Sequence, residues 1–269
     1  MNYNTEAVVV RATAYGETHT IVNLLTPSGT VAAMARGAKK PQSRLSAGVQ
    51  LCVRGMYALY QNRGMGSLNQ VEVLDARRTL REDLERAAYA AYFCELVGTV
   101  AEERPNGSSA VYTQFNGALD RLTGGSGHGQ SGNATGYETA PAIVARIWEA
   151  KVLRMLGASP TWTRCVRCGA ELVQGGWYSP EEGGCVCGSC KMADDTSGIR
   201  RKGLALQRTL PRVLESFSVI PWERLGDVRL SAESVQTLDQ VLRTQMFDYA
   251  GLSLKSREIL QSLTEWENS

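Results

Sequence analysis

Histidine is scarce in this 269-residue sequence, and long apolar runs are missing from it. Its two histidines are His19, in an apolar run, and His128, in a glycine-rich segment, so we expect no His-based catalytic site. No stretch approaches the roughly 18 consecutive apolar residues of a membrane helix. The N-terminal segment lacks the basic and apolar regions of a secretory signal. With 43% hydrophobic and 21% charged residues, the composition is that of a globular protein, which we expect in the cytoplasm.

Signatures of nucleotide and deaminase chemistry are also missing. The segment Gly37-Ala38-Lys39-Lys40 lacks the upstream glycine and the following Ser or Thr of a Walker-type phosphate loop. A zinc deaminase needs an H-x-E or C-x-E signature with an open metal position, and neither occurs around Cys165 or Cys187. We therefore expect no enzyme and assign no catalytic residue.

Cysteine is the residue type that carries the clearest motif. Five of the seven cysteines lie between Cys165 and Cys190, and this fits metal binding better than disulfides because the cytosol keeps thiols reduced. The sequences Cys165-Val-Arg-Cys168 and Cys187-Gly-Ser-Cys190 are two C-x-x-C knuckles separated by eighteen residues. Two such turns supply the four ligands of a closed tetrahedral site. We predict one structural Zn²⁺ per chain, held by these four cysteines.

The remaining cysteines need separate interpretations. Cys185 competes with Cys187 as a ligand, but it lies too close to Cys187 for a knuckle and five residues from Cys190, so we favour Cys187. Cys52 and Cys94 lie in apolar stretches and are expected to be small buried hydrophobes, with reactive thiols as the alternative. The knuckle segment shows almost no apolar core, so we expect the metal to supply its folding free energy, on the order of 10 kcal/mol.

The first 75 residues or so are rich in short β-type runs. No helical pattern of useful length interrupts them, and a Pro27-Ser28-Gly29 turn signal separates two of them. Such a pattern predicts a small closed or partly closed barrel. The expected strands are residues 5–13, 18–26, 30–35, 51–60 and 68–74.

From residue 80 onward the apolar spacing becomes helical. We predict a barrel domain at residues 1–80 and a helical domain at 81–269. The helical domain carries a flexible Gly/Ser insert at 123–140 and the zinc module at 163–192. The expected helices cover 80–105 with a stop at Asn106-Gly107, 109–122, 141–156, 203–217 with a break or kink at Pro211, 231–251 and 255–263.

Charge is unevenly distributed along the chain. Residues 1–81 hold ten Lys or Arg and four acids, a balance of +6, whereas the other 188 residues have a balance of −4. A basic first domain favours contact with a polyanion. Its densest basic segment lies between two expected strands, and there we predict phosphate contacts by Arg36, Lys39, Lys40, Ser43 and Arg44.

Three points about this basic segment stay open. It can instead be an ordinary solvated loop. The arginines at 77, 78 and 81 can extend the basic surface or merely pair with nearby acids on a helix. Only Tyr15, Tyr57 and Tyr60 are available for base stacking, so we expect binding that is directed at the backbone and strongly salt-dependent.

Taken in order, these motifs resemble the RecO family of bacterial recombination-repair proteins. The resemblance spans nearly the whole chain, and the departure from it is the insert at 124–136. The double glycine ahead of the second knuckle also places the first cysteine of that knuckle at Cys187 rather than at Cys185. The matching features are Gly16-Glu17, residues 24–29, 36–43, the Cys165/Cys168 pair, Gly183-Gly184 before Cys187 and Cys190, and residues 254–257.

The resemblance implies an N-terminal OB-fold, a helical domain and an embedded zinc module. It further implies binding of single- and double-stranded DNA, annealing of complementary strands, and partnership with RecR and single-strand-binding protein to help RecA load. A nucleoid-associated location follows. Two other classes remain: a scaffold whose basic loop binds acidic partner tails, and a zinc-dependent enzyme that modifies nucleic acid.

Overall fold

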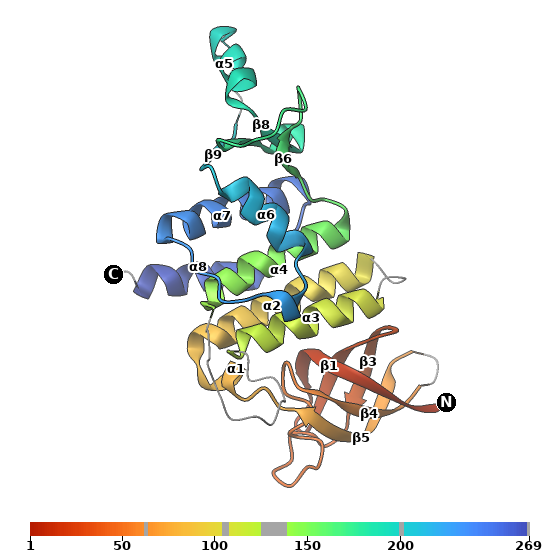
Figure 1. Ribbon diagram of the computed structural model, residues 1–269. Coiled ribbons are helices and arrows are strands. Elements are labelled where there is room, and N and C mark those ends of the chain that lie inside the picture. The colour runs from red at the N-terminus through yellow and green to blue at the C-terminus, as the bar shows by residue number, and fades with distance from the viewer. Residues whose placement is uncertain (62–63, 104–107, 125–138, 199–201, 268–269) are drawn as a thin grey trace. The chain divides into compact units, whose positions relative to one another are not determined.

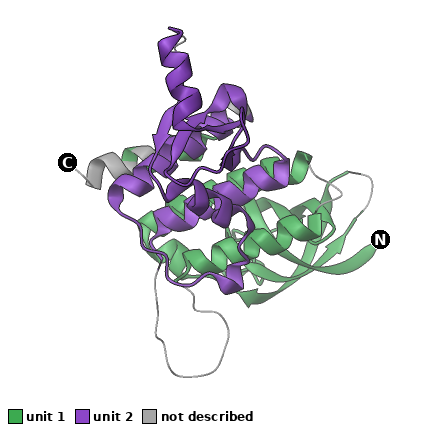
Figure 2. Ribbon diagram, turned by 45° about the horizontal axis from the view of Figure 1, so that its top comes forward, with its two compact units in different colours: residues 1–136, 254–269 green, residues 137–253 purple. Residues whose placement is uncertain are grey.

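The computed structural model describes residues 1–61, 64–103, 108–124, 139–198 and 202–267. The chain divides into two compact units, coloured separately in Figure 2. Unit 1 is Met1–Gly136 with Leu254–Ser269, and unit 2 is Tyr137–Ser253. The boundary expected at residue 80 lies inside unit 1, so the division into 1–80 and 81–269 stays a prediction. Most of the expected insert, with His128, and the expected stop at Asn106-Gly107 lie outside the described residues.

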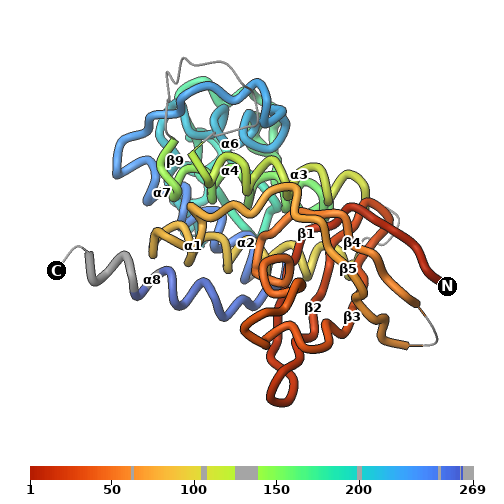
Figure 3. The backbone as a smooth tube through the Cα atoms, turned by 90° about the horizontal axis from the view of Figure 1, so that it is seen from below, coloured from red at the N-terminus to blue at the C-terminus, as the bar shows by residue number. Residues whose placement is uncertain are grey.

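The predicted five-stranded barrel is confirmed. The strands close in the order β1-β2-β3-β5-β4, with β1 pairing antiparallel to both β2 and β4. The closing contact between β3 and β5 is short and parallel, at Ala33–Gly66 and Met34–Ser67. The strands, visible from below in Figure 3, are β1 (Asn2–Tyr15), β2 (His19–Thr26), β3 (Gly29–Ala35), β4 (Arg54–Tyr60) and β5 (Gly66–Asp75).

Strand β1 is buried on both of its faces. Ala7 and Val9 belong to the barrel core, together with Leu24 and Tyr57. Val8 points to the other face and is also fully buried, since helix α2 packs against β1. Successive strand residues face opposite sides. The apolar run in β1 therefore joins the barrel to the helices of unit 1.

Four helices accompany the barrel in unit 1. The long helix α2 contacts α3 and also α8, which returns from the C-terminal end of the chain (Figure 1). Glu95 of α2 accepts hydrogen bonds from the backbone N–H groups of Lys255 and Ser256, at 3.1 and 2.9 Å. Two backbone N–H groups at the N-terminus of α8 thereby gain an acceptor. The helices are α1 (Thr79–Glu82), α2 (Leu84–Glu103), α3 (Ser108–Leu122) and α8 (Lys255–Glu267).

Arg77 occupies the junction between the barrel and these helices. Its side chain is 1% exposed, and its Nη2 donates to Asp120 at 2.7 Å and to Asn116 at 2.8 Å, both on α3. Its Nη1 donates to the Cys52 carbonyl at 3.2 Å. Both expectations for this residue, a surface contact or pairing with acids of the next helix, are wrong. A basic residue just after a strand can enter the interior when acceptors from distant segments meet it there.

Unit 2 is built around α4 (Pro141–Leu156), which is buried on most sides. As predicted, proline lies in its first turn and Gly157 ends it in the left-handed conformation, with φ of 72°. Around it pack α6 (Leu210–Val219) and α7 (Ala232–Thr244). The expected Ser231 cap is confirmed, since its side chain accepts from the Ser234 N–H at 3.2 Å. The helix continues as the π-turn η4 (Gln245–Tyr249).

A small sheet in unit 2 was not expected from the sequence. Its strands run in the order β6-β8-β7-β9, namely β6 (Thr161–Cys165), β8 (Gly184–Val186), β7 (Gly176–Ser179) and β9 (Leu204–Leu206). The prediction of helix over 203–217 is therefore wrong for its first part. Leu204–Leu206 pairs with β7, and Pro211 lies in the first turn of α6, where proline breaks no helical hydrogen bond. Among the described helices none is long and apolar enough to cross a membrane.

Replacing Arg77 by Met should lower the free energy of unfolding by about 2–3 kcal/mol, because the change leaves acceptors on α3 and at Cys52 without their donor. The midpoint of thermal unfolding measures this effect. The matched control is Arg78→Met, since Arg78 is exposed and its loss should change stability by less than about 0.5 kcal/mol. Equal stability of the two variants would contradict a structural role for Arg77.

Candidate functional site

The predicted phosphate-binding residues lie in the connection between β3 and β4, which consists of successive turns. Backbone hydrogen bonds Lys40 N–H to Gly37 O and Ser43 N–H to Lys40 O, at 3.1 and 3.0 Å, shape the first of them. Ala38 and Val49 are buried in the barrel core. Because the apolar side chains turn inward, the connection is a packed cap on the barrel rather than a free loop.

The charged side chains of this connection point outward. Arg36, Lys39, Lys40 and Arg44 are exposed, and the described residues offer none of them an acidic partner. We call residues 36–44 the basic loop. Ser43 is half-buried, and its Oγ accepts from the Leu45 N–H at 3.3 Å. That bond leaves its hydroxyl proton available to a phosphate oxygen.

The start of the basic loop is attached to the turn between β1 and β2. The Gly37 N–H donates to His19 Nδ1 at 3.0 Å, and the Lys39 N–H donates to the Thr18 carbonyl at 3.0 Å. Sequence reasoning gave His19 no role. A histidine directly after a turn carries no signal for a partner eighteen residues away, so only the fold shows the contact.

The far end of the connection is held from the barrel and from Arg77. Tyr57 donates its hydroxyl to Gly48 O at 2.8 Å and also lies 3.2 Å from Val53 O. Burial raises the pKa of Tyr57, so the phenol keeps its proton for these bonds. Arg77 binds the Cys52 carbonyl. The basic loop is thus part of a connection fixed at both ends.

The other candidates for the basic surface are Arg78 and Arg81, and those for base stacking are three tyrosines. Arg78 and Arg81 are both exposed, and Arg81 donates to the Leu51 carbonyl at 3.2 Å. Tyr15 and Tyr60 are 54% and 43% exposed, but Tyr57 is in the barrel core, so stacking on Tyr57 is excluded. The aromatic surface of the barrel is therefore smaller than the sequence allowed.

The four predicted zinc ligands come together in unit 2. The Sγ atoms of Cys165, Cys168, Cys187 and Cys190 all lie within 4.8 Å of one another. The first knuckle follows β6, and the second contains the N-cap and the first turn of helix α5 (Gly188–Thr196). Four cysteine sulfurs in one cluster are a donor set that suits a structural zinc ion.

The electrostatics of the knuckles separate Cys165 from Cys185. Burial works to raise the pKa of the Cys165 thiol, but hydrogen bonds from three backbone N–H groups of the two knuckles lower it to about 6. Burial raises the pKa of Cys185 to about 12. Cys185 lies on β8 and is not part of the sulfur cluster. Its position, rather than its pKa, excludes Cys185 as a ligand, because hydrogen bonding to Cys187 and Cys168 also raises the pKa of Cys190, a member of the cluster, to about 12.

Arg167 braces the two knuckles from within the first one. Its Nε donates to Glu182 at 2.6 Å and its Nη2 to Asp194 of α5 at 2.6 Å. Its Nη1 donates to the Cys190 carbonyl at 3.2 Å. These bonds hold the second knuckle against the first, so the sulfur cluster is supported by a surrounding hydrogen-bond network.

The module around the knuckles has more apolar packing than expected. Trp162 and Tyr178 are fully buried with ring centroids 5.6 Å apart, and Leu172 and Val186 of the same module are also buried. Tyr178 also donates to Gln245 at 2.6 Å. The prediction of almost no apolar core is therefore wrong, because the strands that build the core were not recognised.

Cys52 and Cys94 are buried, as expected. Their Sγ atoms lie 3.5 Å apart. Burial and the neighbouring Cys52 raise the pKa of Cys94 well above its usual value. The pair lies where the β3–β4 connection meets α2, and the protonated thiol of Cys94 is a poor nucleophile.

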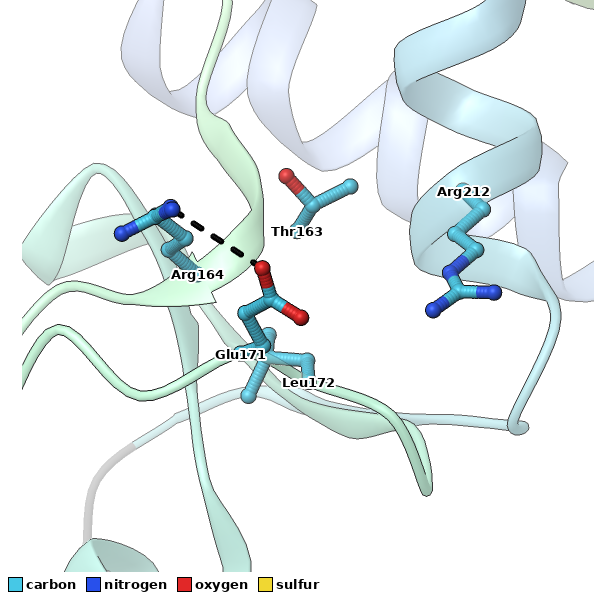
Figure 4. A pocket seen from close by; sticks show the side chains of 5 residues that line it. All are labelled: Thr163, Arg164, Glu171, Leu172 and Arg212. Carbon is cyan, nitrogen blue, oxygen red and sulfur yellow. Dashed lines mark ion pairs between the residues drawn. The ribbon is translucent and has the colours of Figure 1, made fainter.

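Beside the small sheet, unit 2 has a shallow hollow lined by arginines. Arg212 of α6 faces Arg164 and Glu171 across a space of about 110 Å³ (Figure 4). Arg164 and Glu171 are 3.8 Å apart and both about two-thirds exposed, so their pairing is weak. An adjoining space of about 300 Å³ is lined by Arg208 and by exposed Val173. We call this region, defined by Arg164, Arg208 and Arg212, the arginine hollow.

Comparison with known proteins places both parts of the chain in the same family. Residues 1–77 match the family described as "Recombination protein O N terminal", and residues 81–258 match "Recombination protein O C terminal". The DNA repair protein RecO of Listeria monocytogenes serotype 4b (strain CLIP80459) is 33% identical over 264 residues, which is 98% of this chain and 95% of the relative. The proteins of the same name from Bacillus pumilus (strain SAFR-032) and Symbiobacterium thermophilum are 34% and 35% identical over 265 residues. They cover 98% and 97% of this chain and 95% and 97% of the relatives.

Metal analysis of the purified protein should find about one zinc ion per chain. Cys187→Ser should lose the ion, because it removes one of the four clustered sulfurs. Cys185→Ala is the matched control, since Cys185 lies outside the cluster, and it should keep the ion.

Because the module has its own apolar core, chelation should loosen the two knuckles while the far-ultraviolet circular dichroism of the protein changes little. Loss of zinc in Cys185→Ala together with retention in Cys187→Ser would show that the ligand assignment is wrong.

Proposed function

The chain belongs to the RecO family of DNA repair proteins, and from this we propose that it acts as a recombination mediator without bond chemistry of its own. It binds single- and double-stranded DNA, anneals complementary strands and helps RecA load on DNA coated with single-strand-binding protein. RecR and single-strand-binding protein are its partners. Its place is the cytoplasm, at the nucleoid DNA.

The single observation that carries the DNA contact is the fixed basic loop. Arg36, Lys39, Lys40 and Arg44 are exposed, and the connection that carries them is held at Gly37 and at Cys52. Ordered cations bind phosphates with less loss of conformational freedom than those on a free loop. Two strands that meet at this surface repel each other less, since the bound cations screen their phosphates.

The arginine hollow favours a role in partner binding beside the DNA contact. Its arginines surround aliphatic side chains, and it offers no aromatic ring on which a base could stack. This combination suits an acidic peptide with an apolar side chain. We propose that the acidic end of single-strand-binding protein docks there, in unit 2, and that the basic loop stays available for DNA.

The cysteine cluster is assigned a structural role. All four positions of a tetrahedral zinc ion would be taken by Cys165, Cys168, Cys187 and Cys190, with no position left for a substrate or a catalytic water. When bound, the ion would link the two knuckles. The brace made by Arg167 then orients α5, and no step of annealing passes through the metal.

The test of DNA binding removes three charges of the basic loop, in the variant Lys39→Ala/Lys40→Ala/Arg44→Ala. Binding of a single-stranded oligonucleotide should weaken, and the slope of log K against log[salt] should become shallower by about 2 units, at about 0.7 per lost phosphate contact. Annealing of complementary strands should slow as well, and the wild type should need no nucleotide for it.

The matched control removes three exposed charges outside the loop, in Arg154→Ala/Lys202→Ala/Arg224→Ala. Its oligonucleotide binding should keep most of the wild-type salt slope. An unchanged slope in the loop variant, with intact folding, would favour the scaffold class, and a requirement for ATP hydrolysis would favour an enzyme.

The docking proposal is tested with a synthetic peptide that copies the acidic end of a single-strand-binding protein. Arg208→Ala/Arg212→Ala should weaken peptide binding, measured by fluorescence anisotropy, by more than about tenfold because two charge-assisted contacts are lost. Arg154→Ala/Arg224→Ala is the control and should bind normally. If only the loop variant weakened peptide binding, the docking site would be the basic loop rather than the arginine hollow.

A further inference from the structure

We propose that His19 is the positioning residue of the basic loop: its imidazole holds the loop in the phosphate-binding conformation without contacting DNA. The proposal rests on the function proposed for the loop. The contact that supports it joins the Gly37 N–H to His19 Nδ1 at 3.0 Å, between the residue that begins β2 and the residue after Arg36.

The Nδ1 atom of His19 accepts a hydrogen bond from the Gly37 N–H at 3.0 Å. The Thr18 hydroxyl lies farther away, at 3.5 Å from the same nitrogen. A backbone N–H can only donate, so Nδ1 carries a lone pair and the ring proton is on Nε2. The ring is half-buried, which shields this contact from competing water.

The Gly37 N–H, which donates to His19, lies where the loop needs an unusual backbone conformation. Gly37 has a φ of +69°, in the left-handed region, and the loop turns there away from β3. A side chain in its place would meet the Lys40 side chain at 3.6 Å. Glycine permits the turn, but the half-buried N–H still needs a partner. His19 supplies it.

A backbone hydrogen bond beside the Gly37–His19 contact attaches the loop at a second point, nearer to its lysines. The Lys39 N–H donates to the Thr18 carbonyl at 3.0 Å, so the turn between β1 and β2 supports two successive points of the loop. Arg36 and Lys39 lie next to these points and are exposed. Loss of the imidazole removes the side-chain contact and leaves the backbone one. The loop should then open more often, with its charges unchanged.

Trypsin provides a test that needs no DNA. It cleaves after Arg36, Lys39 and Arg44, whereas the Lys40–Pro41 bond resists it, so early fragments report opening of this loop. In the full-length protein, His19→Ala should raise the rate of cleavage in the loop about fivefold, the effect of one lost hydrogen bond. His19→Asn keeps an acceptor at the position of Nδ1 and should restore the wild-type rate. His19→Gln places its acceptor one bond farther out and should not.

Oligonucleotide binding gives the second readout. His19→Ala should weaken it about fivefold with an unchanged salt slope, because the number of phosphate contacts stays the same. His19→Asn should bind as the wild type does. This pattern differs from that of the triple loop variant, which flattens the slope.

Each outcome has a defined meaning. Wild-type cleavage rates in His19→Ala would overturn the positioning role, and so would cleavage that rises equally in His19→Asn. A flattened salt slope in His19→Ala would mean that His19 itself contacts phosphate and would also overturn it. If cleavage of the variants responds as expected but the wild-type protein binds no oligonucleotide, the positioning role stands and the proposed function of the loop is refuted.

Discussion

The buried guanidinium of Arg77 is the interaction on which the arrangement of unit 1 depends. It lies where the last barrel strand leaves the barrel, and it binds Asp120 and Asn116 of α3 and the carbonyl of Cys52. A buried cation is stable only where acceptors surround it, so the barrel, α3 and the end of the β3–β4 connection must be in place together. His19 fixes the other end of that connection. The connection that carries the exposed charges of the basic loop is therefore held at its start by His19 and near its end by the buried Arg77.

The arginines of this chain fall into two groups that the sequence does not distinguish. Arg77 and Arg167 each bind two or more acceptors and tie segments together. Arg36 and Arg44 are exposed in the basic loop, and Arg212 lines the arginine hollow. A count of charges in the first domain treats all of them alike. Acceptors from distant segments separate the two groups: they converge on Arg77 and on Arg167, and at Arg77 they also bury the guanidinium, whereas Arg167 stays exposed.

Local patterns were sufficient for the elements whose signals are local. Short apolar and β-branched runs with turn signals predicted the barrel strands, while the Ser231 side chain and the left-handed conformation of Gly157 marked helix ends. The spacing of the cysteines likewise predicted the sulfur cluster and favoured Cys187 over Cys185, which lies outside the cluster. Contacts between distant residues could not be predicted in this way. Leu204–Leu206 forms β9 only because β7 is beside it, and the role of His19 exists only because Gly37 folds back onto it.

The form of the basic loop suits annealing better than an enclosed site would. A deep cleft that surrounds one strand holds its ligand on all sides, and a second strand must then displace protein contacts before it can pair. In the proposed function, an exposed loop would contact the phosphates and leave the base edges free for a complementary strand. Such binding would be reversible and sensitive to salt, so the product duplex could leave. Such a surface works only if its charges do not collapse onto the protein or scatter with a mobile backbone. The contact at His19 holds the start of the basic loop, and those of Tyr57 and Arg77 hold the rest of the connection, so exposed charge is combined with an anchored backbone.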